Sequence, residues 1–116
     1  VHSLDGYDEI SLTNEFKVAT SESEKIYSPE SLNFHRYTEK DLDGGNTPED
    51  AAKIFDNVMA NRATEAQKEV VIVNAAFAIH VICPEKPIEE CIGLARQSLE
   101  SGKAQATLRK FIELNQ

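Results

Sequence analysis

The residues best suited to chemistry lie near the start of the chain, where Asp5, Asp8 and Glu9 fall within five residues around Gly6. Adjacent carboxylates on a loop can reach the same cation, because a loop does not point successive side chains to opposite faces as a strand does. Such hard oxygen ligands suit Mg²⁺, which takes one or two protein carboxylates and completes its shell with water and phosphate oxygens. Aspartate and glycine are also ordinary turn residues, so spacing alone favours a solvated acidic turn over a metal site.

The other polar candidates give weaker signals. His2 lies six residues before Asp8 and could line the same pocket, whereas His35 is isolated in the sequence. His80 lies in an apolar segment and is predicted to be a hydrogen-bonded core histidine. Asn74 lies in the same segment and needs a hydrogen-bond partner when buried, so we expect it to tie its helix to neighbouring backbone.

The two cysteines, Cys83 and Cys91, cannot form a disulfide framework. We expect buried thiols and a reduced, intracellular setting. No histidine is placed to activate either thiol, and the sequence has no Gly-x-Gly-x-x-Gly, Walker or Gly-x-Ser-x-Gly motif. We therefore assign no catalytic residue and no organic-cofactor-binding residue.

Length and charge narrow the class of protein. The chain has 116 residues, enough for one modest hydrophobic core and too few for a second domain. The 41% hydrophobic and 28% charged residues disfavour disorder. A net charge of −8 disfavours nucleic acid and anionic membrane surfaces as partners. The longest apolar stretch, residues 70–83, is interrupted by Asn74 and His80 and is shorter than the roughly 18 residues of a membrane span.

The first third of the chain is predicted to form short strands and loops. Residues that favour strands occupy 10–13, 16–19 and 25–27, and the polar stretch 20–24 favours a hairpin between the last two. An isolated hairpin is only marginally stable in water, and sheets usually have about five strands. We therefore expect further strands upstream. The chain also begins with Val1 rather than Met, which suggests processing or a piece of a longer protein.

The remainder is predicted to be helical, with clear start signals. Thr47, followed by proline, opens an amphipathic helix that reaches Met59. Thr64 opens a second helix through a capping box, and this helix runs to about Ile82 with apolar residues on nearly every face. A helix that is apolar all round is usually buried all round, so we expect it at the centre of the fold.

Other helical segments are shorter or less apolar. They are expected at residues 29–33, 38–42, 88–99 and 104–112. The predicted fold class is α+β: a β and loop region over 1–37 carries the acidic motif. A helical region over 38–116 follows, with four main helices around the buried central helix.

The order of motifs resembles a known family. Residues 1–13 end in Asp-Gly-Tyr-Asp-Glu-Ile-Ser-Leu-Thr and closely resemble the Val-His-Gly…Asp-Gly-Leu-Asp-Glu-Ile-Ser-Leu-Thr-Gly segment of anthranilate phosphoribosyltransferases. Weaker likenesses follow in the same order and at similar spacing along the whole chain. They are Leu-Asp-Gly-Gly at 42–45, Glu-Asp-Ala at 49–51, Val-Asn-Ala-Ala-Phe-Ala at 73–78 and Ser-Gly-Lys-Ala at 101–104.

This resemblance implies that the chain is the C-terminal part of an α/β domain in a parent about three times longer, by domain-size reasoning. The family transfers a phosphoribosyl group from phosphoribosyl pyrophosphate to anthranilate in tryptophan biosynthesis and releases pyrophosphate. Its paired Asp-Glu binds Mg²⁺ on the diphosphate, a role that falls here on Asp8 and Glu9. The resemblance further implies a cytoplasmic enzyme that forms a homodimer through a helical domain outside these 116 residues.

The chain also departs from the family's pattern. Ser3 and Asn14 replace glycines, and Asp50 replaces an asparagine, but none of these changes touches Asp8 or Glu9. The family's Gly-Thr-Gly-Gly-Asp phosphate loop, its Lys-His-Gly-Asn segment and its anthranilate-binding arginine have no counterpart here, so we expect the chain alone to be inactive. Two alternatives stay open: a binding protein on the same scaffold that has lost catalysis, and a relative of pyrimidine nucleoside phosphorylases, which the acidic motif fits poorly.

Overall fold

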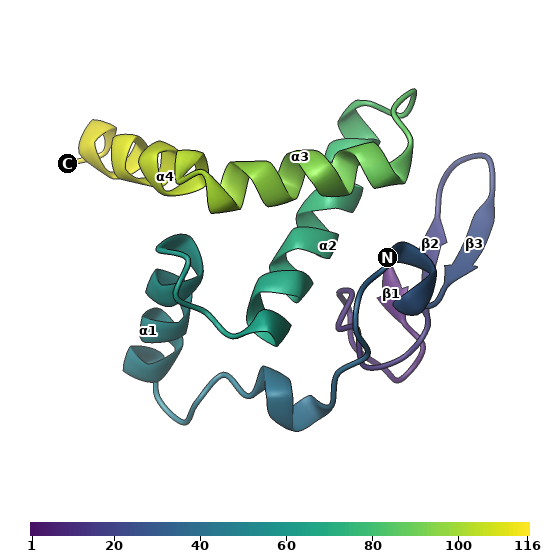
Figure 1. Ribbon diagram of the computed structural model, residues 1–116, viewed down its shortest axis with the longest axis horizontal. Helices are drawn as coiled ribbons and strands as arrows, with labels where there is room; N and C mark the ends of the chain where they lie inside the picture. The colour runs from purple at the N-terminus through teal and green to yellow at the C-terminus, as the bar shows by residue number, and fades with distance from the viewer.

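A computed structural model describes all residues, 1–116, as three short strands, two 3₁₀ turns and four α-helices (Figure 1). In chain order these are β1 (His2–Ser3), β2 (Phe16–Ala19), β3 (Glu24–Tyr27), η1 (Glu30–Leu32), η2 (Glu39–Leu42), α1 (Pro48–Met59), α2 (Glu65–Ile82), α3 (Ile88–Glu100) and α4 (Lys103–Leu114). The predicted α+β fold with four main helices is confirmed. No helix combines the length and the apolar character needed to cross a bilayer.

The strands form one antiparallel sheet in the order β1-β2-β3. In the middle strand, Phe16 pairs with Ser3 of β1 and with Tyr27 of β3. The predicted hairpin between β2 and β3 is confirmed, and a hydrogen bond of 2.8 Å from the Thr20 amide to the Ser23 carbonyl closes its turn. With so few strands, the sheet depends on packing against a neighbouring element.

The predicted strand over 10–13 is wrong, and β1 was not expected. Leu12 has a left-handed backbone conformation with φ 60°, which a regular strand does not contain. The backbone amide and carbonyl of Ile10 bind the side chain of Asn74 in α2 instead of a neighbouring strand. Residues 10–13 therefore form an irregular segment whose apolar side chains, Ile10 and Leu12, are fully buried.

The two longest predicted helices begin at their predicted caps. In α1 the Thr47 hydroxyl accepts a hydrogen bond from the Asp50 amide at 3.1 Å, and Pro48 occupies the first turn, where an N–H would have no helical partner. In α2 the Thr64 hydroxyl accepts from the Gln67 amide at 3.2 Å, and the Gln67 side chain accepts from the Thr64 amide. These reciprocal bonds satisfy donors that a helix start otherwise leaves free.

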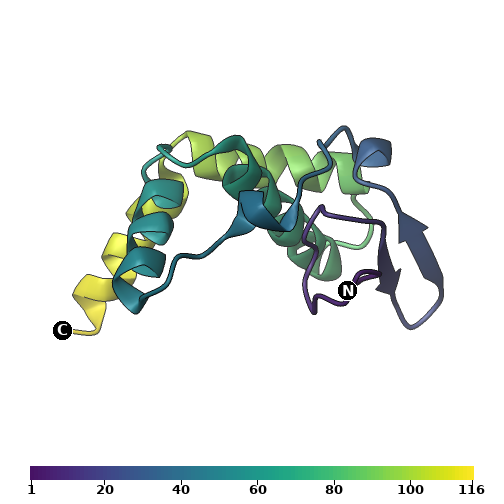
Figure 2. The same cartoon turned by 90° about the horizontal axis from the view of Figure 1, so that it is seen from below.

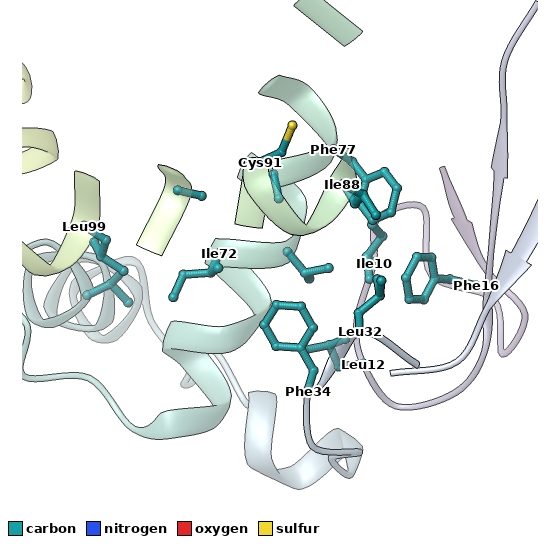
Figure 3. Packing of buried hydrophobic residues seen from close by; sticks show 14 residues of the cluster. Ile10, Leu12, Phe16, Leu32, Phe34, Ile72, Phe77, Ile88, Cys91 and Leu99 are labelled. Atoms are coloured by element: carbon teal, nitrogen blue, oxygen red, sulfur yellow. The ribbon is translucent and has the colours of Figure 1, made fainter. Parts of the chain in front are cut away.

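The central element is α2, with the loop and sheet region on one side and α3 crossing it (Figures 1 and 2). Apolar side chains of these parts meet on α2 and form the core (Figure 3). Phe16 of β2 stacks on Tyr27 and meets Phe77 of α2 edge-on, with ring centroids 5.6 and 5.8 Å apart. This aromatic packing supplies the neighbour that the short hairpin needs.

The expectation that the central helix is buried all round is wrong at its C-terminal end. Val81 and Ile82 are 81% and 80% exposed, because the loop region and α3 bury residues of the preceding turns only. His80 also departs from its prediction, since its buried Nδ1 has no hydrogen-bond partner. In α4 no residue is buried, and its apolar Phe111 and Leu114 are exposed. Burial is therefore concentrated where α2 meets the loop region and α3.

Candidate metal site

The acidic motif lies on a loop, residues 4–9, that leaves β1 and turns back toward Ser3. The Ser3 amide donates a hydrogen bond to the Tyr7 carbonyl, and the Gly6 amide donates to the Ser3 carbonyl, both at 3.0 Å. Gly6 has φ 107°, which residues with a side chain rarely adopt. The Ser3 hydroxyl donates to the Glu9 carbonyl at 2.8 Å. One residue of the sheet therefore binds the loop at three points.

The three carboxylates of the motif have different surroundings. Asp5 accepts a hydrogen bond from the Thr13 hydroxyl and so has a role inside the protein. Asp8 and Glu9, called here the acidic pair, are both exposed, and neither takes part in any ion pair of the structure. Two adjacent carboxylates without a protein counter-ion are available to a cation from solution. The sequence prediction of Asp8 and Glu9 as metal ligands is compatible with this geometry.

An open cavity of about 870 Å³ lies beside this loop, a size common for small-molecule sites. Glu9 lines the cavity together with Tyr7 and two further acidic residues, Glu39 and Asp43. Partial burial and the nearby Glu39 carboxylate raise the pKa of the Tyr7 hydroxyl. The helices α1 and α2 contribute an apolar wall, which consists of Ile54, Val58, Val70 and Val71. The cavity thus combines an acidic side with an apolar one.

The donor set of the acidic pair suits Mg²⁺ better than a metal held by protein ligands alone. No group of three or more His, Cys, Asp or Glu side chains is placed to hold a metal ion. Structural zinc sites need four protein ligands, and Ca²⁺ takes six to eight oxygen ligands. Mg²⁺ can bind through one or two carboxylates when water and substrate phosphates fill the other positions. Asp8 and Glu9 fit that last mode.

The remaining candidates from the sequence do not join this site. His2 lies in β1 opposite Lys17 and is not among the residues that line the cavity, so the expectation that it could do so is wrong. Cys91 is buried as predicted, and Cys83 is partly buried. Burial raises the pKa of the Cys91 thiol, which disfavours the reactive thiolate.

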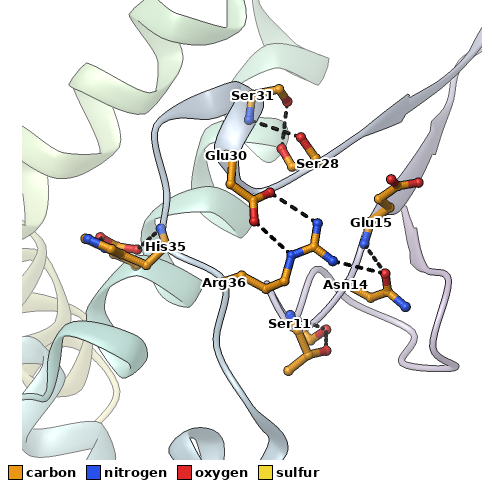
Figure 4. A network of polar contacts seen from close by, with 10 residues as sticks. Ser11, Asn14, Glu15, Ser28, Glu30, Ser31, His35 and Arg36 are labelled. Carbon is orange, nitrogen blue, oxygen red and sulfur yellow. Dashed lines mark hydrogen bonds and ion pairs between the residues drawn. The ribbon is translucent and has the colours of Figure 1, made fainter.

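A polar network connects the segment around η1 to the motif and to α2 (Figure 4). Arg36 donates two hydrogen bonds to Glu30, at 2.8 and 3.1 Å, and a third to Asn14 at 3.3 Å. The hydrogen-bonded arginine lowers the pKa of Glu30. On the other side, the Glu69 carboxylate of α2 is 4% exposed; it accepts from the His35 amide at 3.1 Å and faces the His35 Nδ1 at 3.0 Å. Sequence reasoning missed this contact, because a glutamate near a helix start is ordinary.

Asn74 forms the structural tie that the sequence predicts. Its Oδ1 accepts a hydrogen bond from the Ile10 amide at 3.1 Å, and its Nδ2 donates to the Ile10 carbonyl at 2.7 Å and to the Val70 carbonyl at 2.9 Å. Ile10 directly follows Glu9 in the sequence. The central helix therefore holds the backbone next to the acidic pair.

Known proteins resemble this chain closely. Residues 1–105 match the family described as glycosyl transferase family, a/b domain. Over 115 residues the chain is 79% identical to an anthranilate phosphoribosyltransferase of Bacteroides fragilis strain YCH46 and 76% identical to one of Bacteroides thetaiotaomicron. Each alignment covers 99% of this chain and 35% of the relative, so the chain spans about a third of the length of the curated relatives it matches. The crystal structure of anthranilate phosphoribosyltransferase from Thermus thermophilus shares the fold, with a TM-score of 0.81 and 24% identity over 94% of this chain and 33% of that one.

Proposed function

The chain belongs to the glycosyl transferase family whose a/b domain it matches, and from this premise we propose that it is the C-terminal portion of an anthranilate phosphoribosyltransferase. The complete enzyme would transfer the phosphoribosyl group of phosphoribosyl pyrophosphate to anthranilate, a step of tryptophan biosynthesis. One observation carries the proposal. The acidic pair is exposed, lacks an ion-pair partner and lies beside an open cavity, in a chain 79% identical to a protein of that name.

The proposed role of Asp8 and Glu9 is to hold Mg²⁺ against the substrate's diphosphate. The chemistry supplied by bound Mg²⁺ is neutralisation of the negative charge that collects on the diphosphate as its bond to the ribose C1 breaks. Without the cation, the two carboxylates would repel a diphosphate, so the carboxylates favour the diphosphate only as its metal complex. This accounts for a site with two protein ligands, because phosphate oxygens and water provide the others.

The rest of the proposal concerns the complete polypeptide. We place its phosphate loop and its anthranilate-binding residues in segments other than these 116 residues, and its location in the cytoplasm. Dimerisation through a helical domain is part of the same proposal. It follows that the 116-residue chain alone binds Mg²⁺ weakly and does not turn over its substrates.

The test is an assay of the complete polypeptide in which the loss of anthranilate fluorescence, with phosphoribosyl pyrophosphate and Mg²⁺ present, reports turnover. We expect Asp8→Asn and Glu9→Gln each to lower kcat/KM on the order of 10²–10³-fold, as is typical when one group that stabilises transition-state charge is removed. The matched control is Glu113→Gln, which neutralises an exposed carboxylate on α4 and should keep wild-type turnover.

Each result has a defined meaning. No phosphoribosyl transfer by the complete wild-type polypeptide would overturn the proposed activity. Wild-type turnover by the Asp8→Asn and Glu9→Gln variants would overturn the metal assignment and leave the activity standing. Consumption of anthranilate by the 116-residue chain alone would contradict the placement of essential residues in other segments.

A further inference from the structure

The side-chain amide of Asn74 binds both backbone polar groups of Ile10, with the accepted bond at 3.1 Å and the donated bond at 2.7 Å. Its second amide hydrogen is donated to the Val70 carbonyl, one turn earlier in α2, at 2.9 Å. An amide side chain offers a donor and an acceptor side by side, as the backbone of a neighbouring strand does. Asn74 therefore takes the place of a strand partner for Ile10.

The amide is attached to the best-buried part of the central helix. Its neighbours Ile72, Val73 and Ala76 are all buried in the core. The bond to the Val70 carbonyl also fixes the rotamer of the Asn74 side chain. A side chain with a locked rotamer on a packed helix can hold a functional group in place more closely than a loop residue can.

The backbone on both sides of the acidic pair is held. Before the pair, the Ser3 amide binds the Tyr7 carbonyl; after it, the Ser3 hydroxyl binds the Glu9 carbonyl and Asn74 binds Ile10. We propose that Asn74 is a positioning residue for a divalent cation that binds together with a diphosphate: by fixing Ile10 it sets the direction in which the acidic pair leaves the loop. This inference rests on the proposed function, because it assigns Asn74 to the metal site proposed there.

The test titrates Mn²⁺ alone, as a paramagnetic substitute for Mg²⁺, into the 116-residue chain and follows the broadening of backbone NMR signals. In the wild type we expect the broadening to centre on the acidic pair. In Asn74→Ala the dissociation constant for Mn²⁺ should rise about tenfold or more, which is typical when an outer partner of a metal ligand is lost.

The matched control removes a similar amide far from the loop. Asn61 donates two hydrogen bonds to carbonyls at the end of α3 and has φ 60°, so glycine can replace it without backbone strain. Asn61→Gly should keep the wild-type affinity for Mn²⁺. Urea unfolding of both variants measures their loss of stability separately, so a lower affinity in Asn74→Ala alone reports positioning of the ligands.

The possible outcomes separate the inference from the proposed function. Wild-type binding with unchanged affinity in Asn74→Ala overturns the positioning role and leaves the metal site intact. No Mn²⁺ binding at Asp8 and Glu9 in the wild type overturns the proposed metal site and the inference with it. An affinity that falls equally in Asn61→Gly also overturns the inference, because general loss of stability then explains the effect.

A second variant covers the case in which Asn74→Ala does not fold. Asn74→Asp keeps the shape of the side chain and its acceptor for the Ile10 amide, but removes the donor to the Ile10 carbonyl. The added negative charge would by itself attract Mn²⁺. Weaker Mn²⁺ binding by Asn74→Asp therefore supports positioning, and equal or tighter binding contradicts it.

Discussion

The two sides of α2 differ in how the neighbouring elements are buried. On the side of the metal loop, Ile10, Leu12 and Phe16 are fully buried, and backbone groups of the loop are bound by Ser3 and Asn74. On the side of α1 and α4, one residue of α1 and none of α4 is buried. The order of the proposed metal loop is therefore secured within this chain, whereas α4 is held mainly by its own backbone hydrogen bonds.

The largest difference should appear between two phenylalanines, one from each side. Phe16→Ala removes a fully buried ring that contacts Tyr27 and Phe77, and we expect it to lower the free energy of unfolding by about 3–5 kcal/mol. Phe111→Ala changes a ring on α4 that is 63% exposed, and should cost about 0.5 kcal/mol or less. Urea unfolding followed by circular dichroism measures both. Equal effects would show that the two sides contribute equally to stability.

A smaller difference is expected between two glutamates. Glu69→Ala leaves the His35 amide without its partner, and the loss of a hydrogen bond to a buried group should cost about 1–3 kcal/mol. Glu113→Ala on α4 should change the free energy of unfolding by about 0.5 kcal/mol or less. Thermal and urea unfolding of the two variants test this. A cost for Glu69→Ala no larger than for Glu113→Ala would mean that the contact does not hold the loop region on α2.

The smallest effect concerns an ion pair within the helical region. The hydrogen bond from Lys68, at 2.6 Å, lowers the pKa of Glu100 below its ordinary value of 4.5. A carboxyl with a lowered pKa in the folded state stabilises the protein above its unfolded pKa, and this stabilisation is lost as the pH falls through the folded pKa. Because the Glu100 side chain is 43% exposed, the contribution should be only about 0.2–1 kcal/mol.

The free energy of unfolding at pH 6 and at pH 3, in the wild type and in Glu100→Gln, measures this contribution. The wild type should lose more stability than the variant on acidification, and added salt should reduce the difference, since it screens exposed charges. An equal loss in both proteins would show that the pair between Lys68 and Glu100 contributes nothing.

Local signals in the sequence were enough to predict most of the elements. The caps at Thr47 and Thr64 act within one turn of their helices, so their effect can be predicted from neighbouring residues. Asn74 was predicted to tie its helix to neighbouring backbone, because an amide among apolar residues requires a partner. Which backbone it binds, 64 residues away, could not be predicted from spacing.

The errors arose where distant contacts override local preference. Residues 10–13 have the composition of a strand, but Asn74 binds the Ile10 backbone and Leu12 takes a left-handed conformation. The apolar stripe of α4 predicted a helix correctly, yet a stripe indicates which face is apolar and not what covers it. The metal assignment of Asp8 and Glu9 stays a prediction, because exposure and a nearby cavity permit cation binding without demonstrating it.

The position of Ser3 has a practical consequence when the 116-residue chain is produced by itself. This residue binds the acidic loop through its amide, its carbonyl and its hydroxyl, yet only two residues precede it in that chain. An aminopeptidase that trims three residues would leave every helix intact and still release the base of the loop. Affinity tags for such a preparation therefore belong at the C-terminus, where Leu114 is exposed, rather than in front of Val1.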